Sequence, residues 1–270
     1  MKKVIYKVLI GIFILIMIVS AAALIRYYGT SYLADKKQKD FSNRIKNPEQ
    51  SESATAPEIY DKGASDSNED YKAKYAELLK EYPDLVGWIT IPGTRIDYPV
   101  MQRPGEGTEY YYLKRDYSGD SSSSGSIFAH ESCDIEKPSN NIIIYGHNMK
   151  SGTMFHDLIK YEKKDFCTEN PYITFDSIYK PGIYKVVYAF YTRVSDEHPS
   201  SDEFFRYYEY IDIADQEVFD EYIETCKRLS LYSTDSEVNF GDELITLSTC
   251  SYHIDDGSER FVVVAKRLDV

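Results

Sequence analysis

The chain has 270 residues, of which 43% are hydrophobic, so it can bury one substantial core. Its formal net charge is −13, with 31 basic and 44 acidic residues, and this argues against a nucleic-acid backbone as a partner. The four cysteines include no CxxC pair, and the single C-x-x-H at Cys250 has no second pair to complete a zinc site. We therefore expect neither a metal site nor nucleic-acid binding.

The N-terminus is basic and then strongly apolar. Three lysines precede an uncharged run from Val8 to Ile25, which reaches the roughly 18 residues at which a transmembrane helix is favoured. Because positive charge favours the cytoplasmic side, we predict a cytoplasmic tail (residues 1–7), an uncleaved anchor (8–25) and an extracellular remainder. A cleaved signal peptide is the alternative, since residues 21–23 are small alanines, but the apolar run is longer than is usual for one.

Residues 26–70 are polar and predict an extracellular spacer that separates the anchor from the domain at 71–270. The stretches 51–57 and 62–68 have too few apolar side chains to order themselves. The part of the spacer near the membrane can be helical. Apolar residues at helical spacing from Tyr71 to Tyr82 then predict an amphipathic helix that packs on the domain and ends at Pro83.

The domain is rich in short segments with strand propensity, separated by turn residues. Eight such segments are Val86–Ile91, Ile96–Met101, Ser126–His130, Asn141–Tyr145, Tyr172–Asp176, Ile183–Thr192, Glu243–Ser248 and Phe261–Arg267. They predict a mainly β fold with flanking helices, as a β-barrel or a sandwich.

Two further helices are expected among these strands. A short one is indicated by apolar residues from Met154 to Ile159. A longer one runs from Asp215 to Leu229, with acidic residues first and basic residues last, in accord with the helix dipole. Its apolar face includes Cys226, which is therefore expected to pack inward.

The segment TLSTC ends in Cys250 and is followed by a polar loop, which suits a reactive cysteine better than a core residue. Ten residues later Arg260 opens another strand segment, so an antiparallel pair would bring the two side chains together. The segment ending in YGHN delivers His147 just past a glycine turn. A nucleophile, a proton carrier and a fixed cation are the parts that thiol-based acyl transfer requires.

Other residues near these motifs have weaker claims. Ser248, Thr249 and Asn148 are expected to line a substrate pocket beside Cys250. His130 and His253 are the alternatives to His147 as the proton carrier. Two more histidines, His156 and His198, are expected to be solvated, and the aspartates at 255 and 256 fit a solvated turn better than a role in orienting a histidine.

The motifs TLSTC, YGHN, the interval from Cys250 to Arg260 and VGWITIPGT followed by IDYPV together resemble class B sortases, cysteine transpeptidases of Gram-positive bacteria. The similarity covers residues from about Tyr71 to the C-terminus. It implies an eight-stranded sortase-type barrel with an N-terminal helix and a long helix between the sixth and seventh strands.

The resemblance also implies a reaction. Cys250 would attack the carbonyl after threonine in a C-terminal sorting motif of a secreted protein, with NPxTN or NPxTG as the suspected form. His147 would carry protons, and Arg260 would stabilise the oxyanion. The thioester would pass to an amine of lipid II or peptidoglycan, which anchors surface proteins to the cell wall, and no metal or organic cofactor is needed.

The sequence leaves three other functions open. A cysteine protease would use the same nucleophile with water as the acceptor, and a pilin-polymerising sortase would use a pilin lysine. A non-catalytic surface-binding module on a stalk would keep Cys250 buried. The sequence also leaves open the sorting motif, the acceptor amine and the protonation state of the Cys–His pair.

Overall fold

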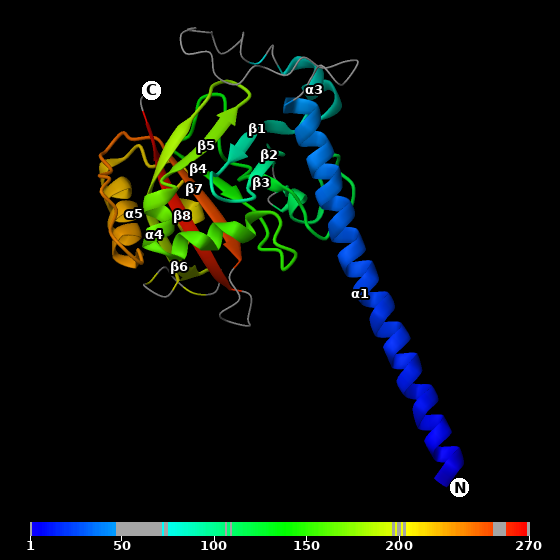
Figure 1. Ribbon diagram of the computed structural model, residues 1–270. Coiled ribbons are helices and arrows are strands. Elements are labelled where there is room, and N and C mark those ends of the chain that lie inside the picture. Colours follow the sequence, from blue (N-terminus) through cyan, green and yellow to red (C-terminus); the bar gives the residue numbers. More distant parts are fainter. Residues whose placement is uncertain are drawn as a thin grey trace.

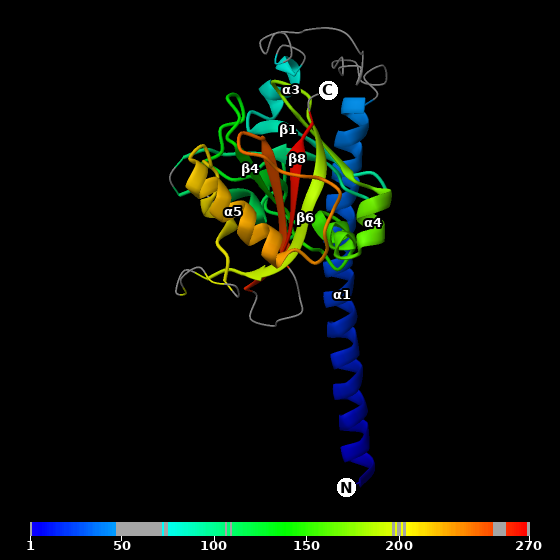
Figure 2. The same cartoon turned by 90° about the vertical axis from the view of Figure 1, so that its left-hand side faces the viewer.

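The computed structural model describes residues 2–46, 72, 75–105, 107–108, 110–195, 198, 201, 204–250 and 258–268 (Figure 1). The two spacer stretches predicted to lack order, at 51–57 and 62–68, lie outside these residues, as do Asp255 and Asp256. The described part contains a β-barrel flanked by helices and one long N-terminal helix (Figures 1 and 2).

Eight strands close into a barrel in the order β1-β2-β3-β4-β7-β8-β6-β5. They are β1 (Leu85–Thr90), β2 (Asp97–Met101), β3 (Ile127–Ala129), β4 (Asn141–Tyr145), β5 (Tyr172–Ser177), β6 (Ile183–Arg193), β7 (Leu244–Cys250) and β8 (Glu259–Arg267). Each predicted strand segment is present, with ends that differ by at most two residues. The closed barrel decides between the two architectures that the sequence left open.

The helices include α3 (Ala76–Glu81), α4 (Lys164–Glu169), α5 (Gln216–Leu229) and the 3₁₀ helices η2 (Tyr111–Lys114), η3 (Phe155–Glu162) and η4 (Tyr207–Glu209). The predicted helix from Tyr71 is represented by α3, which stops just before Pro83. The predicted long helix between the sixth and seventh strands is α5. Asp215 caps it by accepting hydrogen bonds from two backbone N–H groups of the first turn, at 2.9 and 3.2 Å. Sequence patterns did not indicate η2, α4 or η4.

Helix α5 packs mainly against β6 and reaches β7 through a buried tyrosine. The Tyr222 hydroxyl of α5 lies 2.7 Å from Thr246 Oγ1, and Thr246 in turn donates to Asn141 of β4 at 2.8 Å. Because side chains alternate along a strand, Thr246, Ser248 and Cys250 belong to the same face of β7. The buried hydrogen bonds of Thr246 therefore hold β7 in place and fix the side of the strand on which the Cys250 side chain lies.

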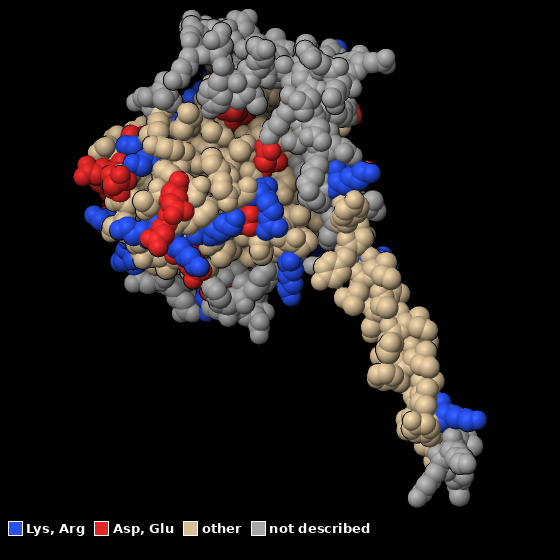
Figure 3. Space-filling view, viewed as in Figure 1, with Lys and Arg blue, Asp and Glu red and all other residues tan. Residues whose placement is uncertain are grey.

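The N-terminal helix α1 (Lys2–Lys46) is longer than the predicted anchor, since it continues through residues 26–46 of the predicted spacer. One segment of it, Ile5–Arg26, is long and apolar enough to cross a membrane, with a mean hydropathy of 3.1 and none of it buried. Figure 3 shows this part of the helix as an uncharged surface with a basic side chain towards the N-terminal end. The same finding is compatible with a signal sequence.

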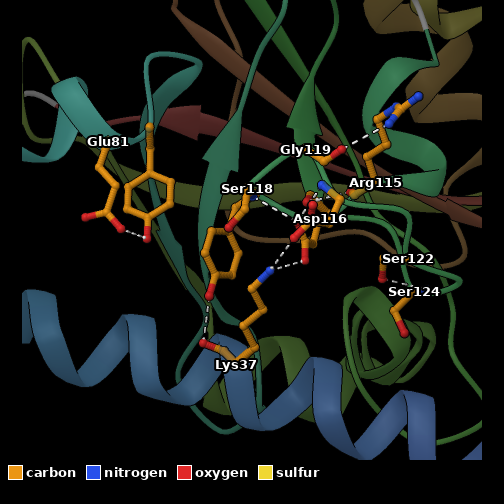
Figure 4. A network of polar contacts seen from close by, with 12 residues as sticks. Lys37, Glu81, Arg115, Asp116, Ser118, Gly119, Ser122 and Ser124 are labelled. Atoms are coloured by element: carbon orange, nitrogen blue, oxygen red, sulfur yellow. Dashed lines mark hydrogen bonds and ion pairs between the residues drawn. The ribbon is translucent and has the colours of Figure 1, made fainter.

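The polar half of α1 contacts the barrel through Lys37 (Figure 4). Its ammonium group pairs with Asp116 at 2.6 Å and Asp120 at 3.2 Å, and its carbonyl accepts a hydrogen bond from the Tyr117 hydroxyl at 2.9 Å. Burial alone would lower the pKa of Lys37, but these carboxylates raise it above its ordinary value. This cluster explains why a polar segment is ordered as helix against the domain.

Candidate active site

Three strand ends meet at one edge of the barrel. Strands β4 and β7 pair in parallel, with Tyr145 opposite Ser248, so both chains leave the sheet at the same edge. Strand β8 pairs with β7 in antiparallel orientation, and Cys250 lies directly opposite Arg260. The predicted juxtaposition of these two residues is confirmed, and it follows from seven consecutive paired positions of the β7–β8 ladder.

A cavity of about 330 Å³ opens at this edge. Its lining combines polar strand-end residues with aromatic side chains from neighbouring segments. The described lining residues are Tyr110, Leu113, Phe128, His130, Glu131, Tyr145, Gly146, His147, Val194, Tyr207, Tyr208, Ser248, Thr249, Cys250 and Arg260. The structure thus brings the predicted nucleophile, proton carrier and cation to one cavity.

His147 reaches the cavity because Gly146 lets the chain turn where no side chain would fit. A Cβ on Gly146 would collide with the Ile127 side chain and would lie 2.7 Å from Phe155 Cγ. The His147 ring is half-buried, and its Nε2 lies 2.7 Å from the carbonyl oxygen of Leu113 in η2. Since a carbonyl only accepts, Nε2 carries a hydrogen in this arrangement, and the lone pair of the neutral ring is on Nδ1.

Arg260 is half-buried, and its Nη1 donates to the carbonyl of Glu259 at 3.0 Å. The charge of Arg260 acts on the neighbouring Tyr207, which is fully buried. Burial raises the pKa of Tyr207 to about 12, while its hydrogen bond with Ser248 and the charge of Arg260 act in the opposite direction. Arg260 is therefore a fixed cation at the cavity wall, one strand away from Cys250.

The three expected pocket residues differ in their positions. Ser248 and Thr249 line the cavity, but both are buried and already bonded, Ser248 to Tyr207 at 2.6 Å and Thr249 to the Gly146 carbonyl at 2.7 Å. Asn148 is not among the described lining residues. Its side-chain amide donates instead to the backbone carbonyl of Cys250 at 3.1 Å, so Asn148 supports the end of β7.

The other histidines lie in different environments. His130 lines the same cavity, whereas His253 lies outside the described residues. His198 is exposed, as expected. The expectation that His156 is solvated is wrong, because its half-buried ring bonds the Asn148 side chain through Nδ1 at 2.8 Å.

Among the cysteines, only the half-buried Cys250 reaches the cavity, and Cys133, Cys167 and Cys226 are buried and free. Burial raises the pKa of the Cys133 thiol to about 12 and that of Cys226 further still. Cys226 packs inward from α5, as its place on the apolar face predicts. Among the described residues, no group of three or more His, Cys, Asp or Glu residues could hold a metal ion.

Several cavity residues carried no signal in the sequence. Tyr207 and Tyr208 arrive from the connection between β6 and α5, and Tyr110 and Leu113 from η2 and the residue before it. The chain has 26 tyrosines, so none stands out by type. Glu131, which directly follows His130, was also missed, although a charged pair at the end of a strand could have drawn attention to it.

Comparison with known proteins shows which family this chain belongs to. The Sortase domain model matches residues 89–268. The chain belongs to the sortase family. Over 216 residues it is 34% identical to Sortase B of Listeria monocytogenes, covering 78% of this chain and 81% of that protein.

Solved sortases share the fold as well. A Staphylococcus aureus sortase B–substrate complex matches with a TM-score of 0.70 and 25% identity, over 89% of this chain and 98% of that one. A structure of Sortase B complexed with triglycine also matches with a TM-score of 0.70 and 25% identity, over 89% and 99% of the chains. The eight-stranded barrel with its helices is therefore a sortase barrel, and the protein is a sortase B-like cysteine transpeptidase.

Proposed function

We propose that this sortase cleaves a sorting motif after threonine and transfers the acyl group to a peptidoglycan-precursor amine, with Cys250 as the nucleophile. The observation that carries the proposal is the position of Cys250 opposite Arg260, with His147 in the same cavity. A thiol, a ring that exchanges protons near neutral pH and a cation that does not titrate suffice for a thioester mechanism without a cofactor.

In the first half-reaction the Cys250 thiol gives its proton to His147, and the sulfur attacks the threonine carbonyl. Negative charge develops on the carbonyl oxygen, and Arg260, one strand away, stabilises it. The departing amine takes a proton from His147 as the carbon–nitrogen bond breaks, which leaves the acyl group on sulfur. In the second half-reaction an incoming amine loses a proton to His147 and attacks the thioester, and the carbon–sulfur bond breaks.

The partners are inferred from the reaction class. The donor would be a secreted protein with a C-terminal sorting signal of the NPxTN or NPxTG kind, and the acceptor an amine of lipid II or peptidoglycan. The solved relatives bound to a substrate and to triglycine support both kinds of partner. The outcome for the Gram-positive cell would be covalent attachment of surface proteins to its wall.

We further propose that Ile5–Arg26 anchors the enzyme in the cell membrane, with the tail before it in the cytoplasm and the domain outside. In both ribbon views α1 projects beyond the end of the barrel at which β7 ends and β8 begins (Figures 1 and 2). This arrangement would turn the cavity towards the membrane surface, where a lipid-linked acceptor is found. Protease treatment of intact protoplasts should digest the domain, and a protected domain or a released soluble form would contradict the anchor.

The catalytic proposal is tested with the full-length enzyme in detergent. Peptides containing NPxTN, NPxTG, SPxTG or LPxTG are offered with and without triglycine or diaminopimelate. We expect an amine adduct cut after threonine and an acyl group on Cys250 by mass spectrometry. Cys250→Ala should abolish turnover, whereas Cys226→Ala should not, because the Cys226 thiol is buried and is not among the described residues that line the cavity. Turnover by Cys250→Ala would refute the assignment of the nucleophile.

Three alternatives make different predictions when these peptides are offered with different amines. A cysteine protease would release the acid with water as the acceptor whichever natural amine is present. A non-catalytic surface-binding module would form no acyl-enzyme with any peptide while Cys250 is reduced. A pilin lysine as the preferred amine would indicate pilus assembly.

A further inference from the structure

The nucleophile lies just past the point where the pairing of β4 with β7 stops. The last paired positions are Tyr145 and Ser248, and the Ser248 carbonyl accepts a hydrogen bond from the Gly146 N–H at 3.1 Å. Backbone groups two residues apart on a strand point to the same side, so the Cys250 carbonyl also faces the chain that leaves β4. In a continued ladder its donor would be the N–H of residue 148.

A side chain takes the place of that backbone donor. Strand β4 ends at Tyr145, and the backbone of Asn148 forms a bridge with Met154 instead of with β7. The Asn148 side-chain nitrogen Nδ2 donates to the Cys250 carbonyl at 3.1 Å. Because Asn148 directly follows His147, this hydrogen bond links the turn that carries the proton carrier to the backbone of the nucleophile.

A histidine fixes the orientation of the Asn148 amide. His156 Nδ1 lies 2.8 Å from Asn148 Oδ1. Since a backbone carbonyl only accepts, the amide must turn its NH₂ group to Cys250 and its oxygen to His156. His156 Nδ1 therefore carries a hydrogen, and the lone pair of the neutral ring is on Nε2. The hydrogen-bond chain runs in one direction, from His156 through Asn148 to Cys250.

The backbone between Asn148 and His156 adopts an unfavourable conformation. Met154 has a φ of +57°, and in the described part of the chain it is the only residue other than glycine with a positive φ. Its backbone N–H donates to the Tyr98 hydroxyl at 3.1 Å, and its side chain is buried. Such a conformation persists only where surrounding contacts impose it, and strained residues are concentrated at functional sites. The strain lies where the chain turns back to bring His156 to Asn148.

We propose that Asn148 and His156 are positioning residues, which hold the backbone of the nucleophile against the turn after β4. This inference rests on the proposed role of Cys250 in the reaction. The β7–β8 ladder sets the position of Cys250 relative to Arg260, whereas the hydrogen-bond chain sets it relative to His147. Neither positioning residue is among the described residues that line the cavity, so both act through the backbone and not by contact with substrate.

The first test removes the donor of His156 with a matched pair of variants. Asparagine places an N–H donor close to the position of histidine Nδ1, and leucine has nearly the same shape without a donor. In the full-length enzyme, His156→Leu should lower the rate of acyl-enzyme formation at saturating peptide about tenfold, and His156→Asn should recover most of it. The KM for the peptide should not change. Equal rates in the two variants, or a raised KM instead of a lowered rate, would overturn the proposal.

The second test shows whether the two side chains act in series. Asn148→Leu should lower the rate of acyl-enzyme formation on the order of 10²-fold, and adding His156→Leu should cause no further loss. Asn148→Asp keeps an acceptor for His156 but presents a carboxylate to the Cys250 carbonyl, so it should be as slow as Asn148→Leu. Losses that multiply in the double variant, or a wild-type rate for Asn148→Asp, would contradict the series.

An NMR measurement separates this inference from the catalytic one. In full-length protein labelled with ¹³C at the cysteine carbonyls, the Cys250 signal is identified by its loss in Cys250→Ala. Asn148→Leu should shift this signal, and His156→Leu should shift it in part, whether or not acyl transfer occurs. In ¹⁵N-histidine protein, the His156 signal, identified by its loss in His156→Asn, should show hydrogen on Nδ1. An unmoved Cys250 signal, or hydrogen on Nε2 alone, would refute the hydrogen-bond chain even if the enzyme proves to be a transpeptidase.

Discussion

The contact that orients His147 depends on a glycine 22 residues before it in the sequence. Gly125 has a φ of +59° and packs against the chain at η2, where an added Cβ would lie 2.5 Å from the Leu113 carbonyl oxygen and 2.8 Å from that of Tyr112. Leu113 is the residue whose carbonyl lies 2.7 Å from His147 Nε2. Gly125→Ala is therefore a way to move this acceptor without touching the histidine.

The size of the effect follows from these distances. An ordinary contact of a Cβ begins at 3.4 Å, so the Leu113 oxygen must withdraw by about 0.9 Å from its 2.5 Å position. If this movement is directly away from His147, the oxygen would be about 3.6 Å from Nε2, which is beyond hydrogen-bonding distance. The left-handed backbone costs alanine about 1 to 2 kcal/mol, and the lost hydrogen bond adds about 1 kcal/mol. A proton carrier misplaced by about 1 Å can lower the rate on the order of 10²-fold.

Gly119→Ala is the matched control. Gly119 has a φ of +82°, but its added Cβ would meet only the Tyr111 hydroxyl, at 3.5 Å. Unfolding in denaturant, followed by the fluorescence of the single tryptophan, measures stability, and amine-dependent transfer measures activity. We expect both variants to lose about 1 to 2 kcal/mol from the backbone change, and only Gly125→Ala to lose activity well beyond the fraction unfolded. Equal transfer rates in the two folded variants would refute the role of the Leu113 carbonyl.

Three further outcomes test the rest of the structure. Arg260→Ala should lower the transfer rate on the order of 10²-fold, and Arg260→Lys should recover only part of it; wild-type rates in both would exclude the oxyanion role. Burial alone would raise the pKa of Asp157, but hydrogen bonds from Arg95 lower it from 3.8 to about 2. The ionised Asp157 therefore stabilises the fold above about pH 4, and this stabilisation is lost as the pH falls towards about 2. In denaturant unfolding at about pH 7, Asp157→Asn should lower the free energy of unfolding by on the order of 2 kcal/mol. The difference from wild type should shrink at acid pH. Asp215→Ala should cost about 1 kcal/mol, whereas an unchanged free energy of unfolding would mean that the cap of α5 contributes nothing.

The features that could be predicted from the sequence are those fixed by neighbours along the chain. Strand segments such as β4 and β7 are dense in β-branched and apolar residues, and their ends were placed within two residues. The opposition of Cys250 and Arg260 could also be predicted, because β7 and β8 are consecutive strands joined by a short polar connection. Helix α5 follows from its period, its charge order and its Asp215 cap.

The features that could not be predicted depend on contacts between irregular segments. Leu113 and His147 are 34 residues apart, and their contact requires η2 to lie beside the turn that follows β4. Asn148 was expected in the pocket because it follows His147, but the turn after β4 directs its amide to the Cys250 carbonyl. The spacer next to the anchor is helical, as expected, but its contact with the domain through Lys37 could not be predicted, because the partners of Lys37 lie about 80 residues away in the chain.

The two halves of the site therefore have different physical supports. Cys250 and Arg260 are held by a ladder of seven pairs, so a local change elsewhere in the barrel should leave their separation intact. His147 depends on one backbone carbonyl and one close glycine contact. Because of this difference, Gly125→Ala should slow proton transfer while iodoacetamide still reaches the Cys250 sulfur, and Arg260→Ala should weaken oxyanion stabilisation without moving the histidine. If both variants changed alkylation of Cys250 and transfer by the same factor, the site would behave as one rigid unit, and its division between strand ladder and loop contact would be wrong.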